Sequence, residues 1–214
     1  LLNLDGRRSF TGDTEDVVFI NQGPYKIKRQ YNDFDWKAQE RFLHYIDTEY
    51  KKYPERFDNI SVTVVMPTFN RASEITRAIE SIQSQTHKNW NLIVVDDGSS
   101  DNTKDAVDNF KYDNRISYNF VDHVGVSGAR NKGLLLSKGE YVAYLDSDNT
   151  WTSEFLRSMI VFLAQNNLDA AYSAIHSIND QGNTVCYRGD VFVWSACKSA
   201  NYVDLNPFIH RRDL

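Results

Sequence analysis

The sequence predicts an α/β fold in which helices flank a mostly parallel sheet, preceded by an N-terminal helical arm. From Ile60 onward, short β-branched runs alternate with amphipathic segments of helical length. Three of the expected strands end in polar clusters, at 67–71, 96–99 and 146–149. This alternation is typical of a parallel sheet covered on both faces, with ligands bound at the carboxyl ends of its strands.

The composition is that of an ordinary globular protein. The chain has 214 residues, of which 41% are hydrophobic and 25% charged, and its formal net charge is -5. These values exclude collagenous and low-complexity chains, and the negative charge disfavours binding to nucleic acid. No stretch approaches the length of apolar sequence that a transmembrane helix needs, so we expect no transmembrane segment.

The cysteines and the chain ends bear on location and completeness. Cys186 and Cys197 are too few for a disulfide framework and lack the spacing of a zinc site. We therefore expect reduced thiols and a cytoplasmic location, with attachment to the inner face of a membrane as a further option. Because the chain begins at Leu1 and ends at Leu214 soon after a strand-like run, we expect a fragment of a longer parent chain. Its partners would be the remaining domains of that chain or a second copy.

Residues 1–60 are rich in Tyr, Phe, Lys and Asp and are expected to form the arm. A helix is expected over about 34–53, because Phe42, Ile46 and Tyr50 recur at helical spacing and form one apolar face. We expect this face to pack against other protein rather than to bind a ligand. Asp33 and Asp35 stand at the start of this helix, where carboxylates favour the positive end of the helix dipole, so capping is their expected role.

Hydrophobic periodicity predicts the elements that follow the arm. Residues 61–66 form a β-branched run that ends at Pro67, and 73–85 place apolar residues on one helical face. The same pattern then recurs. It predicts further strands at 91–95, 115–121, 141–145 and 169–174, and further helices at 99–110, 126–137 and 152–165.

Two pairs of acidic residues stand at expected strand ends. Asp146 and Asp148 follow the apolar run YVAYL, and two carboxylates on one tight turn offer the hard oxygen ligands that Mg²⁺ or Mn²⁺ needs to hold a diphosphate. Asp96 and Asp97 follow another strand, where they either cap a helix or bind a nucleoside through its base N–H or its ribose hydroxyls. Spacing alone leaves both roles open for this second pair.

Three basic residues, Arg71, Arg130 and Lys132, are expected near the same edge of the sheet. Each of them alone is more often a solvated surface charge than a ligand contact. Only their convergence on one crevice would make them available to a phosphate.

The motifs together carry a family resemblance. They are VTVVMPTFNR, AIESIQSQTHKNWNLIVVDDGSSDNT and GVSGARNKGLLLSKGEYVAYLDSDN. In this order and spacing they resemble the nucleotide-binding half of the inverting family 2 glycosyltransferases, which have the GT-A fold. The resemblance covers roughly 61–175. It implies three parts: an N-terminal arm at 1–60, a nucleotide-sugar-binding half at 61–175, and the start of an acceptor half at 176–214.

The resemblance also implies residue roles. Asp97 matches the position that hydrogen-bonds uracil, Asp148 would ligate the metal, and Asp146 would contact ribose and share the metal. The other residues that the resemblance places at the nucleotide are Pro67, Thr68, Phe69, Arg71, Asp96, Gly128, Ala129, Arg130 and Ser147.

The implied activity is the transfer of a sugar from a UDP-sugar to an acceptor hydroxyl with inversion, on a saccharide or another acceptor. Mn²⁺ or Mg²⁺ would neutralise the leaving diphosphate. An inverting transfer also needs a general base, and the acidic motif that supplies it in the family's acceptor half is absent from this chain. A surface or turn role is the expected one for Asp190 and Asp204, so the catalytic residue stays unassigned.

Two further hypotheses come from other functional classes. The run from Asp146 to Thr150 also matches the D-x-D-x-T of haloacid-dehalogenase-like phosphatases, but that motif normally opens its domain and here it lies late in the chain. The other hypothesis is a domain without turnover, which binds a nucleotide sugar or serves as a partner module.

Overall fold

The structure is a computed structural model that describes residues 19–22, 25–28, 36–179, 181–188 and 205–214. The chain divides into two compact units: Tyr50–Ala171 with Phe208–Leu214, and Leu1–Glu49 with Tyr172–Pro207. The predicted functional division of the chain after residues 60 and 175 stays a prediction.

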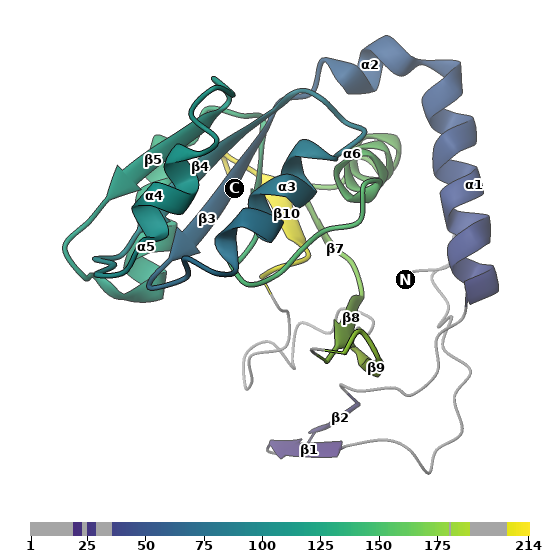
Figure 1. Cartoon of the computed structure of the whole chain (residues 1–214). Helices are drawn as coiled ribbons and strands as arrows, with labels where there is room; N and C mark the ends of the chain where they lie inside the picture. The colour runs from purple at the N-terminus through teal and green to yellow at the C-terminus, as the bar shows by residue number, and fades with distance from the viewer. Residues whose placement is uncertain (1–18, 23–24, 29–35, 180, 189–204) are drawn as a thin grey trace. The chain divides into compact units, whose positions relative to one another are not determined.

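A six-stranded sheet forms the centre of the first unit, in the strand order β5-β4-β3-β6-β10-β7 (Figure 1). Its strands are β3 (Val62–Thr68), β4 (Trp90–Asp96), β5 (Ile116–Phe120), β6 (Tyr141–Tyr144), β7 (Ala170–Tyr172) and β10 (Phe208–Arg211). β3 pairs in parallel with both β4 and β6, and β4 pairs in parallel with β5. β10 is antiparallel to β6. The predicted mostly parallel sheet is therefore confirmed.

Helices cover both faces of this sheet. The helices of this unit are α2 (Pro54–Asp58), α3 (Ile75–Gln83), α4 (Thr103–Asp108), α5 (Gly125–Leu136) and α6 (Phe155–Asn166), and α2 packs against α6. In Figure 1, α3 and α4 lie in front of the sheet, and α5 packs on β3 and β4 from behind. A Cβ atom on Gly133 of α5 would lie 2.3 Å from a methyl carbon of Val65, so glycine lets this helix approach β3 closely. The strand β3 is consequently buried along its whole length.

Pro67 lies inside β3, which corrects the prediction that the strand ends before it. The strand continues to Thr68, and Pro67 is paired with Val95 of β4. The backbone groups of Val65 point toward β6, since Leu145 N donates to Val65 O, and those of Pro67 point to the same side. The next bond on this side would need an N–H from Pro67, so the pairing with β6 stops at Tyr144 while β3 continues beside β4.

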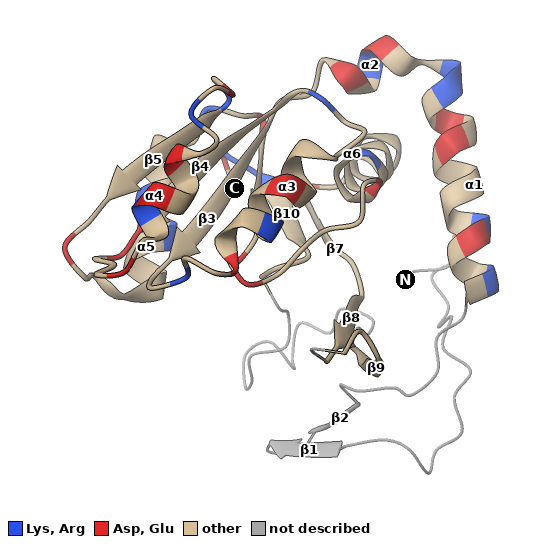
Figure 2. Ribbon diagram, viewed as in Figure 1, with Lys and Arg blue, Asp and Glu red and all other residues tan. Residues whose placement is uncertain are grey.

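The second unit contains two antiparallel hairpins and most of the helix α1. Its elements are β1 (Phe19–Gln22), β2 (Tyr25–Lys28), α1 (Trp36–Lys52), β8 (Ile175–Ile178) and β9 (Thr184–Arg188). α1 agrees with the expected helix, and acidic and basic residues alternate along it (Figure 2). Asp33, Asp35 and Cys197 lie outside the described residues, and Cys186 is buried. Within the described part of the chain, no helix combines the length and the apolar character needed to cross a bilayer.

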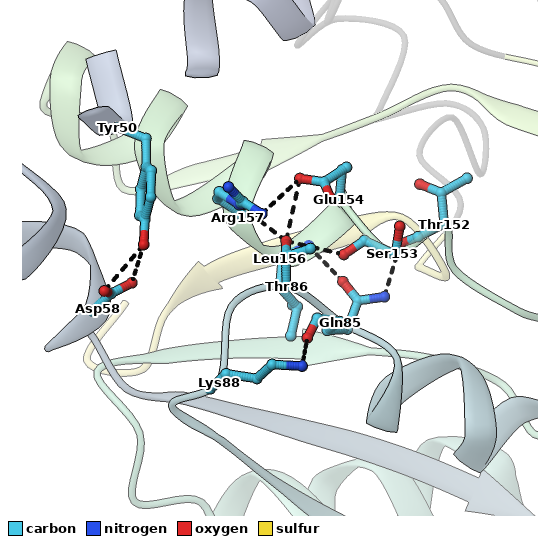
Figure 3. Close-up of polar contacts among 10 residues, drawn as sticks. All are labelled: Tyr50, Asp58, Gln85, Thr86, Lys88, Thr152, Ser153, Glu154, Leu156 and Arg157. Carbon is cyan, nitrogen blue, oxygen red and sulfur yellow. Dashed lines mark hydrogen bonds and ion pairs between the residues drawn. The ribbon is translucent and has the colours of Figure 1, made fainter. Parts of the chain in front are cut away.

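Gln85, just after α3, fixes the start of α6 (Figure 3). Its Oε1 accepts the N–H of Leu156 at 2.9 Å, and its Nε2 donates to the carbonyl oxygen of Thr152 at 2.8 Å. The first N–H groups of a helix have no partner within the helix, so Gln85 acts as a cap supplied from another element. It thereby anchors the far end of the segment that leads from the Asp146 loop into α6.

His87 is a buried titratable group in the same region, and it leads to a prediction about pH. Its side chain is nearly inaccessible, and Nε2 lies 2.9 Å from the carbonyl oxygen of Ile60. Burial lowers the pKa of His87. The His87 imidazole therefore binds a proton more readily in the unfolded chain than in the folded chain. The free energy of unfolding is retained above the pKa of about 6.5 that histidine has in an unfolded chain, and it falls as the pH drops below that value.

We expect the free energy of unfolding to drop by up to about 1 kcal/mol between pH 7.5 and pH 5.5 on account of His87. His87→Gln keeps a donor for Ile60 but does not titrate, so its loss between the two pH values should be smaller by that amount. His44→Gln, at an exposed position on α1, is the matched control. It should lose as much unfolding free energy between the two pH values as wild type does. Urea unfolding at both pH values measures these free energies. If wild type and His87→Gln lost the same amount between the two pH values, His87 would not be the group whose protonation lowers stability.

Candidate nucleotide-binding site

A cavity of about 350 Å³ lies at the carboxyl ends of β3, β4 and β6. The predicted convergence of three loops at this edge is confirmed, because all three contribute to the lining. The predicted site residues in the lining are Pro67, Thr68, Phe69, Arg71, Asp97, Asp146, Ser147 and Asp148. Three residues that the sequence did not indicate also line it: His123, Gly125 and Val126.

Asp97 joins the ends of β3 and β4 to the start of α5. Its N–H donates to the carbonyl oxygen of Thr68 at 2.8 Å, and its Oδ1 accepts the N–H of Val124 at 2.6 Å. His123 Nδ1 lies 3.1 Å from the Asp97 carbonyl oxygen and 3.6 Å from Oδ2. Because Oδ1 is engaged by the backbone, Oδ2 is the oxygen with which a ligand N–H could pair.

Asp96 has a different environment from its neighbour and does not line the cavity. Its Oδ1 accepts the N–H of Ser99 at 2.8 Å, and its Oδ2 accepts the hydroxyl of Tyr118 at 2.6 Å. Burial, together with this hydrogen bond, raises the pKa of Tyr118, so the phenol stays protonated and remains a donor. Asp96 therefore stabilises the turn that presents Asp97.

Phe69 and His123 form an aromatic pair at the cavity, with ring centroids 4.9 Å apart and an interplanar angle of 47°. His123 has a φ of 31°, and the turn that faces it needs Gly98, whose φ is 84°. A Cβ atom on Gly98 would lie 3.3 Å from His123 N. A single histidine in a loop carries no periodic or spacing signal, so only the fold reveals this pair. Its ring faces suit stacking of a flat base.

The two acidic residues after β6 are each paired with an arginine. Asp146 Oδ1 lies 2.6 Å from a terminal nitrogen of Arg130 on α5. Asp148 Oδ2 lies 3.3 Å from a terminal nitrogen of Arg71, which follows β3. Figure 2 shows acidic segments in the loops at the end of the sheet toward which the arrows of β3 and β5 point. The arginines partly neutralise this cluster of carboxylates.

Three predicted site residues on α5 lie behind the cavity rather than in its lining. Ala129 is buried against Ile93 and Val95 of β4. A Cβ atom on Gly128 would lie 2.7 Å from a methyl carbon of Val124, so glycine is required where the chain enters the helix. Arg130 reaches Asp146 from this helix. Lys132, also on α5, is exposed and does not line the cavity.

The donor set fits a divalent cation that arrives with a diphosphate. Asp146 and Asp148 both line the cavity, and Mg²⁺ is commonly held by one or two carboxylates together with substrate phosphate oxygens. Within the described ranges, no group of three or more His, Cys, Asp or Glu side chains could hold a metal without such a ligand. Asp190 and Asp204, considered above for the general base, lie outside those ranges.

Comparisons with known proteins agree with this geometry. The sequence model of the family described as glycosyl transferase family 2 matches residues 63–200. An uncharacterized glycosyltransferase of Rickettsia conorii is 31% identical over 141 residues, which cover 63% of this chain and 23% of that protein. The glucosyltransferase WfgD of Escherichia coli, named for UDP-Glc and α-D-GlcNAc-diphosphoundecaprenol, is 37% identical over 124 residues, 58% of this chain and 49% of WfgD. The chain thus spans between about a quarter and a half of the length of these relatives.

Solved structures of a Staphylococcus aureus protein, TarS, have the same fold. TarS 1–349 superimposes with a TM-score of 0.58 at 22% identity, over 72% of this chain and 47% of that one. The same protein in complex with UDP-GlcNAc gives a TM-score of 0.54 at 25% identity, over 58% of this chain and 37% of that one. The mostly parallel sheet flanked by helices is therefore the GT-A fold.

Proposed function

The chain belongs to glycosyl transferase family 2, and from this membership we propose that it forms the donor-binding part of an enzyme that transfers a sugar from a UDP-sugar to an acceptor hydroxyl. The observation that carries the proposal is that Phe69, Asp97 and Asp148 line one cavity. Two of the similar proteins support the choice of donor, since WfgD is named for UDP-Glc and TarS was solved with UDP-GlcNAc. Family membership also removes the phosphatase hypothesis.

Each part of the cavity has a role in this proposal. Uracil stacks at the pair formed by Phe69 and His123, and its imide N–H donates to the carboxylate of Asp97. Asp146, held in place by Arg130, contacts the ribose. Asp148 and Asp146 would hold a divalent cation, which supplies Lewis-acid stabilisation of the leaving diphosphate when bound.

The transfer step needs more than the described residues. An acceptor hydroxyl must attack the sugar carbon opposite the leaving nucleotide and lose its proton to a general base, and this geometry inverts the configuration. We assign that base to the acceptor part of the parent protein. The name of WfgD supports a saccharide linked to a lipid diphosphate as the acceptor, and hence a parent that works at the inner face of a membrane.

We expect calorimetry of this chain in Mn²⁺ to show tighter binding of UDP than of GDP or inorganic pyrophosphate, by about tenfold or more. The reason is that pairing of Asp97 with a base N–H contributes the energy of a charge-assisted hydrogen bond. Binding of all three ligands with equal affinity would remove uracil recognition from the proposal. Tight UDP binding in a parent protein that transfers no sugar to any saccharide acceptor would favour the domain without turnover.

A further inference from the structure

The two arginine–carboxylate pairs at the cavity differ in exposure and in contact distance. Arg130 and Asp146 are 2.6 Å apart, with side chains 19% and 29% exposed. Arg71 and Asp148 are 3.3 Å apart, with side chains 44% and 43% exposed. Arg71 lines the cavity, whereas Arg130 lies behind it. The first pair is therefore short and shielded, and the second is longer and solvated.

These differences give the two pairs different strengths. A solvated ion pair with one long contact contributes little free energy, because water and salt screen it and two side chains must be ordered to make it. A short pair with restricted access to water is held more firmly. Arg130 is thus suited to hold Asp146 permanently, while Arg71 can leave Asp148 at little cost.

The backbone around Arg71 is held by hydrogen bonds, while its side chain is half-exposed in the cavity lining. Arg71 N donates to Thr103 Oγ1 at 2.9 Å. The preceding residue, Asn70, donates its N–H to Ser99 Oγ at 2.8 Å, and the following Ala72 donates to Asp101 Oδ2 at 3.1 Å. Three successive N–H groups are therefore tied to the segment after β4. A change of partner by the guanidinium therefore needs only a change of side-chain rotamer and no shift of the backbone.

We propose that Arg71 is an exchangeable counter-cation: it neutralises Asp148 in the nucleotide-free protein and moves to the diphosphate when a divalent cation takes its place. This inference rests on the proposed function. Arg71 and a divalent cation repel one another and compete for the same carboxylate, so one must leave when the other binds. The planar guanidinium matches the oxygens of a phosphate group better than a lysine ammonium does.

The exchange predicts positive coupling between the cation and the nucleotide. The cation alone must displace Arg71 without compensation, and the nucleotide alone meets an Arg71 that is still engaged with Asp148. When both bind, the released guanidinium gains a diphosphate partner. Each ligand therefore raises the affinity for the other by the same factor.

The test is calorimetry of this chain with Mn²⁺ alone and with UDP in the presence of Mn²⁺. Arg71→Gln should bind Mn²⁺ alone about two- to fivefold more tightly than wild type, because its competitor is gone. It should bind UDP with Mn²⁺ about tenfold more weakly, because a diphosphate contact is lost. Arg77→Gln, at an exposed position on α3 outside the cavity lining, is the control and should change neither affinity.

A second variant separates charge from shape. Arg71→Lys keeps a cation near Asp148 but lacks the guanidinium fork, so its affinity for Mn²⁺ alone should stay near that of wild type while UDP binds more weakly. Unchanged or weaker Mn²⁺ binding by Arg71→Gln would overturn the exchange, even if UDP still binds. If wild type failed to bind UDP at all, the proposed donor site would be wrong, and the titrations with Mn²⁺ alone would still test the competition at Asp148.

Discussion

Asp97→Asn is expected to weaken UDP binding by about 10- to 100-fold while leaving the affinity for pyrophosphate within about twofold of wild type. In the proposed complex the carboxylate accepts the imide N–H through a charge-assisted hydrogen bond. Asparagine loses the charge, and with its oxygen on Val124 N–H it presents an NH₂ donor where the ligand N–H needs an acceptor. Asparagine can still accept the Val124 N–H through its side-chain oxygen, which in wild type lies 2.6 Å from that nitrogen. The start of α5 should therefore remain in place. Calorimetry with both ligands in Mn²⁺ measures the two affinities.

Two measurements separate recognition from folding in this variant. Urea unfolding should give a free energy within about 1 kcal/mol of wild type, since the hydrogen bond to the backbone is retained. Asp96→Asn, at the neighbouring position, is the matched control. It disturbs the turn held by Ser99 and Tyr118, so it should mainly lower the free energy of unfolding and have a smaller effect on the ratio of the UDP and GDP affinities. If Asp97→Asn weakened pyrophosphate as much as UDP, the residue would shape the loop without reading the base.

Local sequence signals were sufficient for most strands of the sheet and for the helix α5 that packs on it. β-branched runs and apolar faces at helical spacing predicted β3, β4, β6 and α5 within about two residues, because these signals depend on neighbours along the chain. They also predicted that the loops after these strands converge, since parallel strands end at one edge. The position of Asp97 and Asp148 in one cavity follows from that rule.

Features set by distant contacts could not be predicted in this way. β10 enters the sheet beside β6 from the last residues of the chain, and no local pattern reveals which strand it pairs with. Gln85 caps α6 across 71 positions of sequence, and His123 joins Phe69 only because a turn at Gly98 brings their loops together. The strand continues through Pro67 because β4 remains paired with it on the other side, which the proline rule alone does not anticipate.

Asp148→Asn is expected to remove the dependence of UDP binding on Mn²⁺ and, in the parent protein, to lower sugar transfer by about 100-fold or more. Asparagine retains one oxygen but no charge, so it is a weak ligand for a hard cation. Without the cation, the negative charge that develops on the leaving diphosphate is left to Arg71 alone. Calorimetry with Mn²⁺ and after chelation, together with transfer assays of the parent, measures both effects.

Stability provides the control for this second variant. The Asp148 side chain is 43% exposed and its ion pair with Arg71 is solvated, so its loss should change the free energy of unfolding by less than about 1 kcal/mol. Asp148→Asn in Mn²⁺ should bind UDP at least as tightly as wild type after chelation, because both lack the cation and the variant also leaves Arg71 free for the diphosphate. A variant that still responded to Mn²⁺ would place the metal on Asp146 without Asp148. Arg71 would then have no competitor to yield to, and the exchange proposed for it would fail by the same experiment.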